Sequence, residues 1–450
     1  MIRRKTCFVA ATAALIALFA GCGDNDNNPA GSGEQQPSGV LVVDSQGGQS
    51  FAEGNITTNT TWTSDNTYVL RGAVFVEEGA TLTIQPGTVI QGESSSQPPG
   101  TMIVAQGARI IADGTAENPI VFTSDQPVGD RGRGQWGGLI INGRAPLNTG
   151  DTAEGEGDTG RYGGNIPGDD SGILRYVRVE YAGIEFSPDN ELNGIAFQGV
   201  GSGTVVDYIQ VHYNQDDGVE FFGGTVNAKH VLCTGIRDDS FDWTDGWTGK
   251  GQFWVAQQVG DDADQGFEAD NNGDNNDLVP RSDPTIYNFT LIGDPNGPES
   301  DTGMLLREGT AGTIRNGIVM GFNLSGIDID QSSTAAQISS GGLSVESCLF
   351  YGNTPANFHD DDEGEGLPAF DESTWAVAAG LNLVEADPIL MAPYNTTVPD
   401  FRPGAGSPAL DGTVPVAAPP ADGFFEAVDY IGGVDPGDDW TQGWTNFSPN

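Results

Sequence analysis

Residues 208–243 read YIQVHYNQDDGVEFFGGTVNAKHVLCTGIRDDSFDW, and this stretch contains two copies of one pattern. In each copy a β-rich run is followed by a short unit, which is a small or polar pair and then alternating apolar positions. The short units are DGVEF, which starts at Asp217, and DSFDW, which starts at Asp239. Because such alternation is typical of strands and not of helices, the pattern predicts short strands that recur along the chain.

The short unit recurs over much of the chain. Its copies begin at Asn193, Asp217, Asp239, Gln265, Thr302 and Ser325, at steps of 24, 22, 26, 37 and 23 residues. Such a period, with two or three short strands per copy, is typical of a parallel β-solenoid whose coils stack about 4.8 Å apart. Sandwiches and propellers need antiparallel hairpins with tight two-residue turns, which are not the pattern here. We therefore predict an all-β parallel solenoid.

The composition agrees with a repeat and narrows the choice of partners. The chain has 450 residues, 18 Lys+Arg against 63 Asp+Glu, and a formal net charge of −45. This charge disfavours nucleic acids, whose phosphates it repels, and anionic lipid surfaces. The hydrophobic share of 37% is too high for a wholly disordered chain. One globular core rarely serves a chain of this length, whereas the core of a solenoid is continuous.

The first residues have the features of an export signal. A basic start precedes a short apolar run, and LFAGC at 18–22 resembles the bacterial lipobox. We therefore expect residues 1–21 to be a lipoprotein signal peptide, Cys22 to carry lipid, and 22–45 to be a flexible tether. The alternative is an ordinary signal peptide that is cut nearby. The prediction is an exported protein at the outer membrane or cell surface of a bacterium, which contacts the membrane through its lipid anchor only.

Several runs carry a resemblance to a known family. They are GATLTIQPGTVIQG at 79–92, NPIVFTS at 118–124, QWGGLIING at 135–143 and DDGVEFFGGTVN at 216–227. They resemble the right-handed parallel β-helix of bacterial secreted surface proteins and lipoproteins, which is the pectin-lyase-like fold. The resemblance implies the fold but no single reaction, because this fold hosts lyases, hydrolases, adhesins and inert scaffolds.

We expect the β-helix to span residues 46–385 and to have capped ends. Residues 50–66 are rich in Thr, Asn and Ser, and they are predicted to begin an N-terminal cap. Residues 371–379 predict a short helix with Asp371 at its N-cap and a Gly just beyond its end. The Pro-rich, aromatic tail at 386–450 is predicted to wrap the C-terminal end of the β-helix.

The tail also repeats part of the body. Residues 439–445 read DWTQGWT and match DWTDGWT at 242–248 with a single change. Two similar turns would explain this match, and so would a tail that docks beside the first copy.

Carboxylates recur in phase with the repeat. Aligning the short units places Glu220, Asp242 and Glu268 in one column on consecutive coils, between Ala196 and Leu305. Like charges at this spacing repel by about 1 kcal/mol per pair even when solvated, and a divalent cation relieves the repulsion. Oxygen ligands from turns suit Ca²⁺, whereas a Zn²⁺ site would need Cys or His pairs at ligand spacing. A solvated acidic face is the alternative, although general acidity alone would scatter the carboxylates.

The predicted Ca²⁺ site comprises the column and the acidic residues around it. Its ligands are Asp216, Asp217, Glu220, Asp238, Asp239, Asp242, Asp264, Glu268 and Asp270. Ca²⁺ is the one cofactor that the sequence predicts.

A polysaccharide-active enzyme, either a lyase or a glycoside hydrolase, is the alternative function. It would use an acidic, aromatic-lined groove at 214–270, in which Asp216-Asp217 resembles the paired Asp of pectin-degrading hydrolases on this fold. The Gly-His-Gly and Arg-x-Lys elements of those hydrolases are absent, so no catalytic residue is assigned. The rings that could stack on a sugar are Trp243, Trp247 and Trp254.

Cations are scarce in the same region. A lyase would need a base near the sugar, and the local candidates are Lys229, Arg237 and Lys250, which could equally pair with nearby carboxylates. An acidic polysaccharide would be repelled by this chain unless Ca²⁺ bridges the two. We therefore favour a binding or structural role over catalysis, with a polysaccharide or a surface protein as the partner.

Overall fold

The computed structural model describes residues 43–46, 49–187, 190–260, 263–359 and 370–450. The chain divides into two units, Met1–Pro37 and Ser38–Asn450, and every described residue lies in the second unit. The predicted signal peptide, Cys22 and nearly all of the predicted tether lie outside the described residues. Among the described residues, no helix has the length and apolar character needed to cross a membrane.

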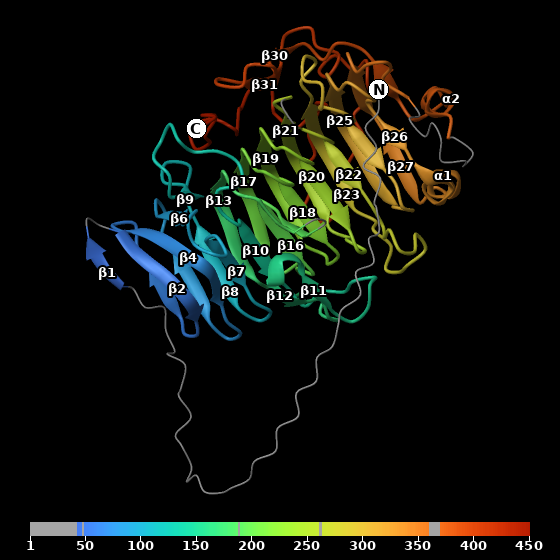
Figure 1. Ribbon diagram of the computed structural model, residues 1–450. Helices are drawn as coiled ribbons and strands as arrows, with labels where there is room; N and C mark the ends of the chain where they lie inside the picture. The colour runs from blue at the N-terminus through green and yellow to red at the C-terminus, as the bar shows by residue number, and fades with distance from the viewer. Residues whose placement is uncertain (1–42, 47–48, 188–189, 261–262, 360–369) are drawn as a thin grey trace, which may run out of the picture. The chain divides into compact units, whose positions relative to one another are not determined.

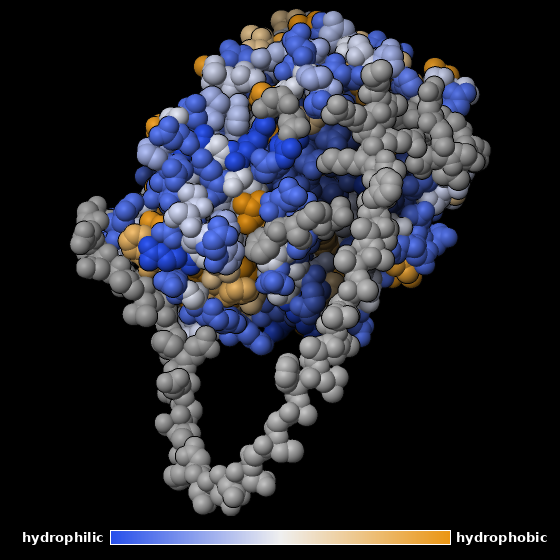
Figure 2. Space-filling model, in the orientation of Figure 1, coloured by the Kyte–Doolittle hydropathy of each residue, from blue (hydrophilic) through white to orange (hydrophobic). Residues whose placement is uncertain are grey.

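The second unit is a right-handed parallel β-helix, as predicted (Figure 1). In the described part of the chain, 25 strands join in one sheet. Each coil has three faces, which are named A, B and C in chain order. The surface seen in Figure 2 is mainly hydrophilic, in keeping with the high net charge.

Six long strands cross face A and then face B. They are β13 (Gly172–Glu180), β17 (Val205–His212), β19 (Asn227–Thr234), β21 (Lys250–Gln257), β23 (Thr285–Ile292) and β25 (Gly312–Met320). Face A also contains β3 (Thr60–Trp62), β5 (Thr81–Ile84), β8 (Arg109–Asp113) and β27 (Leu343–Glu346). Face B also contains β6 (Val89–Gly92), β9 (Ile120–Ser124), β28 (Cys348–Tyr351) and β29 (Leu383–Glu385).

Face C consists mainly of short strands. They are β7 (Thr101–Val104), β10 (Leu139–Asn142), β16 (Ile195–Gln198), β18 (Val219–Phe222), β20 (Phe241–Thr244), β22 (Phe267–Ala269), β24 (Met304–Leu306) and β26 (Asp328–Ile329). Two strands at the N-terminal end, β2 (Gln49–Ile56) and β4 (Thr67–Val76), cross face B and then face C. The short repeat unit of the sequence therefore corresponds to face C.

The core is a ladder of apolar side chains inside the coils. On face C, Ile195, Val219, Phe241, Phe267 and Met304 are partners on successive strands, and all are fully buried. Because side chains alternate along a strand, the residue that follows each of them points outward. The repeat thus builds one continuous core and, at the same time, one outward column.

One residue with a left-handed backbone turns each long strand from face A to face B. These residues are Tyr176, Tyr208, His230, Phe253, Asn288 and Asn316, with φ between 48° and 60°. Rings stack along this corner, with 4.1 Å between the centroids of Tyr208 and His230 and 5.0 Å between those of His230 and Phe253. A positive φ is unusual for residues that carry a side chain, so the stacking offsets part of its cost.

The C-terminal tail covers the outside of face B, and the prediction that it wraps the C-terminal end is wrong. Outward side chains of face B, such as Leu232 and Val255, form a buried apolar cluster with Phe401 and Ile431 of the tail. Figure 1 shows the red tail running back from the orange coils toward earlier ones. Near its end, the carbonyl oxygen of Ser448 accepts a hydrogen bond from the Tyr181 hydroxyl at 2.7 Å.

Side-chain amides of the long strands hold the backbone of the tail. Gln210, Gln252 and Asn316 each donate to the carbonyl and accept from the N–H of one tail residue. Their respective partners are Asn446, Glu426 and Ala417. The tail is therefore fixed by its backbone as well as by its apolar side chains.

The ends of the β-helix differ from the prediction in detail. Residues 50–66 form the first coil and not a cap, and β1 (Val43–Gln46) pairs with β2 in the antiparallel direction at that edge. The predicted helix is present but shorter, as α2 (Glu372–Ala376), and the Asp371 carboxylate accepts the N–H of Thr374 at 2.8 Å. A second helix, α1 (Gln331–Ser340), was not predicted.

The two DWT copies lie on different faces. In the first copy, Trp243 and Trp247 belong to the core beneath face C. In the second copy, Trp444 lies against the corner of faces A and B, with 6.3 Å between its ring centroid and that of Tyr208. Each copy contains a turn, closed by the bonds Trp247 N–H to Thr244 and Gln442 N–H to Asp439. The two turns involve different positions of the motif, so the match does not correspond to one shared turn, and the second copy contacts the corner of faces A and B and not the first copy.

Replacing Gln252 by Leu tests how the tail is held. The side chain of Gln252 is fully buried, and its amide satisfies both backbone groups of Glu426. Leaving these groups unpaired should lower the free energy of unfolding by about 1–3 kcal/mol and make the tail more sensitive to protease. Thermal unfolding and limited proteolysis measure this, with Gln49→Leu at an exposed position as the control. Equal stability and equal cleavage of both variants would contradict this role of the amide.

Candidate functional site

The predicted column of carboxylates is in register on face C. Glu220 on β18 pairs with Asp242 on β20, and Asp242 pairs with Glu268 on β22. Ala196 precedes this column and Leu305 follows it, as the alignment of the sequence predicted. The column is therefore confirmed residue by residue.

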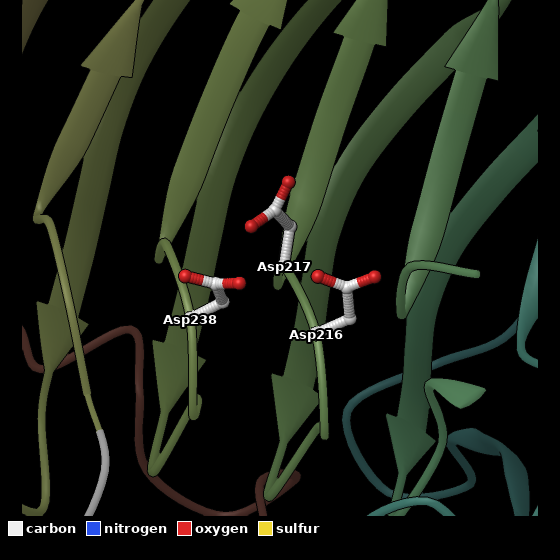
Figure 3. A group of neighbouring side chains, drawn as sticks. All are labelled: Asp216, Asp217 and Asp238. Carbon is white, nitrogen blue, oxygen red and sulfur yellow. The ribbon is translucent and has the colours of Figure 1, made fainter. Parts of the chain in front are cut away.

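Aspartates from the turns before these strands lie beside the column. Asp216 and Asp217 precede β18, and Asp238 and Asp239 precede β20. Figure 3 shows the carboxylates of Asp216, Asp217 and Asp238 gathered from two neighbouring coils. The carboxylate row is the name used here for Asp216, Asp217, Glu220, Asp238, Asp239, Asp242 and Glu268.

Three overlapping groups in the row bring one oxygen from each carboxylate within 4.8 Å of the others. The outer group is Asp216, Asp217 and Asp238, the middle group is Asp217, Glu220 and Asp242, and the third group is Asp239, Asp242 and Glu268. Neighbouring groups share Asp217 or Asp242. Two predicted ligands, Asp264 and Asp270, belong to none of the groups found among the described residues.

The row points outward from face C but is covered. Glu220 and Asp242 are only 7% and 8% exposed. Two inserted hairpins, β11–β12 (Ala153–Gly155 and Gly160–Tyr162) and β14–β15 (Ile184–Ser187 and Asn190–Leu192), provide an outer apolar layer on face C. The row is therefore a half-enclosed site and not a solvated acidic face.

The insertions also bring charge to the row. Glu156 lies in the short helix η1 (Glu156–Asp158) between β11 and β12, and Glu191 lies in β15. Both charges raise the pKa of Asp216. These two residues were not predicted, because they lie in insertions that do not follow the repeat.

The carboxylates of the row differ in their partners. Glu220 accepts a hydrogen bond from the amide of Asn193, and Glu268 pairs with the guanidinium of Arg307 at 2.7 Å. In contrast, Oδ1 of Asp242 is buried and has no hydrogen-bond partner among the described residues. Asp242 also belongs to two of the groups, so an acceptor without a donor lies in the middle of the row.

Two aspartates of the row also hold the backbone of the next coil. Asp217 Oδ1 accepts the N–H of Asp239 at 3.1 Å, and Asp239 Oδ1 accepts the N–H of Gln265 at 2.6 Å. Gln265 continues this ladder by accepting the N–H of Thr302 at 3.0 Å. These residues open successive short units of the sequence, so this position supports the stacking of the coils as well as the row.

Burial raises the pKa of these carboxyl groups. For Asp216, burial and then repulsion by Asp238 raise the pKa to about 8. Burial and the neighbouring carboxylates raise the pKa of Asp242 well above its usual range, although Arg307 opposes the rise. The pKa of Glu268 is raised by burial to about 8 despite its ion pair. Groups of this kind take up protons unless a cation compensates them.

The donor set of the row fits a hard divalent cation. Every donor in the groups is a carboxylate oxygen, and separations of up to 4.8 Å allow several oxygens to reach one ion at the usual Ca–O distance of about 2.3–2.6 Å. The middle group would hold the ion through Asp217, Glu220 and Asp242. The buried Oδ1 of Asp242, which has no hydrogen-bond partner among the described residues, would then contact the ion.

The predicted sugar-stacking rings are not at the surface, so that prediction is wrong. Trp243, Trp247 and Trp254 are 0% exposed and belong to the core. Their indole N–H groups donate to Thr310 Oγ1 and to the carbonyls of Val226 and Ala228, respectively. Alternation along the strands points the rings inward, so these three rings do not line a groove at 214–270.

Two of the three predicted cations pair with the tail. Lys229 and Lys250 form ion pairs with Glu426 and Asp422 of the tail. Arg307, which was not predicted, pairs with Glu268 in the row. It escaped the sequence analysis because the repeat makes its longest step, 37 residues, just before this coil.

A family model described as a pectate-lyase-like β-helix domain matches residues 54–381. The chain belongs to the pectate-lyase-like β-helix family. No curated protein and no solved structure matches the chain. Membership of the pectate-lyase-like β-helix family confirms the fold part of the resemblance and suggests a carbohydrate-related or surface role, but it selects no reaction.

The raised pKa values predict how stability depends on pH when a chelator removes metal ions. Asp216 and Glu268 hold their protons up to about pH 8 in the folded protein, whereas unfolded carboxyl groups release them near about pH 4. The folded state binds more protons in this window, so the stability contributed by these groups should fall as the pH rises from 4 to 8. The slope is about 1.4 kcal/mol per pH unit for each proton.

Thermal unfolding between pH 5 and 8 in chelator measures this dependence. Asp216→Asn should make the decline shallower, whereas Asp411→Asn, at an exposed position outside the row, should not. An identical decline in both variants would contradict the assignment.

Proposed function

We propose that this β-helix protein is exported, anchored by lipid on Cys22, and binds Ca²⁺ in the carboxylate row, with a binding or structural role at the surface of a bacterial cell. Its partner is a polysaccharide or a surface protein. The anchor and the location rest on the sequence of residues 1–22, with its basic start, apolar run and lipobox-like LFAGC. The family supports the carbohydrate or surface part of the proposal.

The middle group carries the cation-binding part of the proposal. Asp217, Glu220 and Asp242 are all buried, their oxygens lie within 4.8 Å of one another, and Asp242 Oδ1 lacks a donor. Burial of uncompensated carboxylates costs several kcal/mol. A Ca²⁺ ion would relieve this cost, because it accepts several carboxylate oxygens at once.

Calorimetric titration of the full exported chain with Ca²⁺ tests the proposal. We expect a heat of binding, and at a free Ca²⁺ concentration of 100 times Kd a gain in stability of about 2.7 kcal/mol over the sample in chelator. Asp242→Asn should weaken binding by at least about tenfold, because it removes a ligand charge. Asp130→Asn, at an exposed position away from the row, is the matched control. No heat and no change in melting temperature would contradict Ca²⁺ binding.

A second candidate function, a polysaccharide-active enzyme, is favoured by the outer group. Asp216, Asp217 and Asp238 gather three carboxylates, and the residue before Asp216 lines an open groove of about 640 Å³. Gln97, Arg133, Ile184 and Gln215 are among the lining residues of this groove. Carboxylates beside a groove are the minimum that glycoside hydrolysis requires.

Turnover assays distinguish the two functions. Our proposal expects no turnover on a panel of acidic and neutral polysaccharides, with Ca²⁺ or with chelator. Turnover that Asp216→Asn or Asp217→Asn abolishes, while Asp130→Asn retains it, would favour the enzyme instead.

A further inference from the structure

The carboxylate row contacts a guanidinium at Glu268. At the end toward the C-terminal coils, Nη2 of Arg307 lies 2.7 Å from Oε2 of Glu268. The same guanidinium meets Asp270 through Nε at 2.9 Å and through Nη2 at 3.0 Å. One side chain thus engages two carboxylates in a two-pronged geometry that only a guanidinium offers.

The backbone register places Arg307 at the row. Arg307 directly follows β24, and its N–H donates to the carbonyl of Ala269 on the preceding coil at 2.9 Å. Ala269 lies between Glu268 and Asp270 in the chain, so the pairing of the coils sets the guanidinium beside both carboxylates. The side chain of Arg307 is only 30% exposed, which strengthens the pairing relative to one at the open surface.

Among the described residues, the middle group has no such partner. Glu220 receives a neutral amide from Asn193, Asp217 receives a backbone N–H, and Asp242 Oδ1 receives nothing. Within the described part of the chain, no Lys or Arg forms an ion pair with any of these three carboxylates.

We infer that Arg307 is a built-in cation of the row, which occupies the place of a metal ion beside Glu268 and confines Ca²⁺ to the end formed by Asp217, Glu220 and Asp242. This inference rests on the proposed function and refines it. Glu268 and Asp270 are then not ligands, although the sequence pattern predicts them as such. The Arg side chain sets how many ions the row accepts.

Glu220→Gln and Glu268→Gln form a matched pair that tests the inference. Both variants make the same chemical change in the same column, two coils apart. In a Ca²⁺ titration, Glu220→Gln should weaken binding by about tenfold or more, whereas Glu268→Gln should stay within about twofold of the native chain. Equal losses in the two variants would overturn the inference.

Arg307→Gln tests the same inference in the opposite direction. Without the guanidinium, the carboxylates of the third group have no positive charge beside them and should bind a metal ion. This variant should therefore bind one more Ca²⁺ per chain than the native protein. In chelator, its melting temperature should lie below that of the native chain. Added Ca²⁺ should then raise it by more than it raises the melting temperature of the native chain. Arg315→Gln, which breaks an ion pair of 2.9 Å with Glu346 on face A, is the control.

The outcomes separate this inference from the proposed function. Unchanged stoichiometry in Arg307→Gln, with the native chain binding Ca²⁺, would contradict the inference and leave the proposed function standing. A native chain that binds no Ca²⁺ would contradict the proposed function and, with it, the inference. If Arg307→Gln does not fold, as judged by circular dichroism, the comparison of Glu220→Gln with Glu268→Gln decides.

Discussion

The parallel pairing of each strand with the strand one coil away is the constraint on which the rest of the structure depends. It places residues that repeat in the sequence directly above one another. Inside the coils this register stacks Ile195, Val219, Phe241 and Phe267 into a continuous core. Outside, the same register stacks Glu220, Asp242 and Glu268, whose mutual repulsion no local adjustment of a strand can avoid.

The row resolves this repulsion in different ways along its length. A side-chain amide donates to Glu220, and backbone N–H groups donate to Asp217 and Asp239. A guanidinium forms an ion pair with Glu268. Asp242 is the member for which the described residues offer no donor. Burial and Asp238 raise the pKa of Asp216, and Glu156 and Glu191 on the insertions raise it further. These features together are the basis of the proposed cation site.

The features that the repeat encodes could be predicted from the sequence. Because strand alternation and coil register follow the repeat, the fold and the column from Ala196 to Leu305 could be predicted position by position. Prediction failed where the relevant contacts are not periodic. The path of the tail depends on side-chain amides such as that of Gln252, which no sequence pattern indicates. Arg307 follows the longest step of the repeat, so its place beside the row could not be predicted from the alignment. The tryptophans were wrongly predicted to face outward, because adjacent residues of a strand point to opposite sides. Asp242 points outward, so the next residue, Trp243, points into the core.

A crystal structure grown with Ca²⁺ measures the central claim most directly. We expect a strong peak in the anomalous difference map within about 2.3–2.6 Å of carboxylate oxygens of Asp217 and Asp242, with the Arg307 guanidinium still beside Glu268. At saturating Ca²⁺, the absence of such a peak, with carboxylate oxygens of the middle group within direct hydrogen-bond distance of one another, would contradict it.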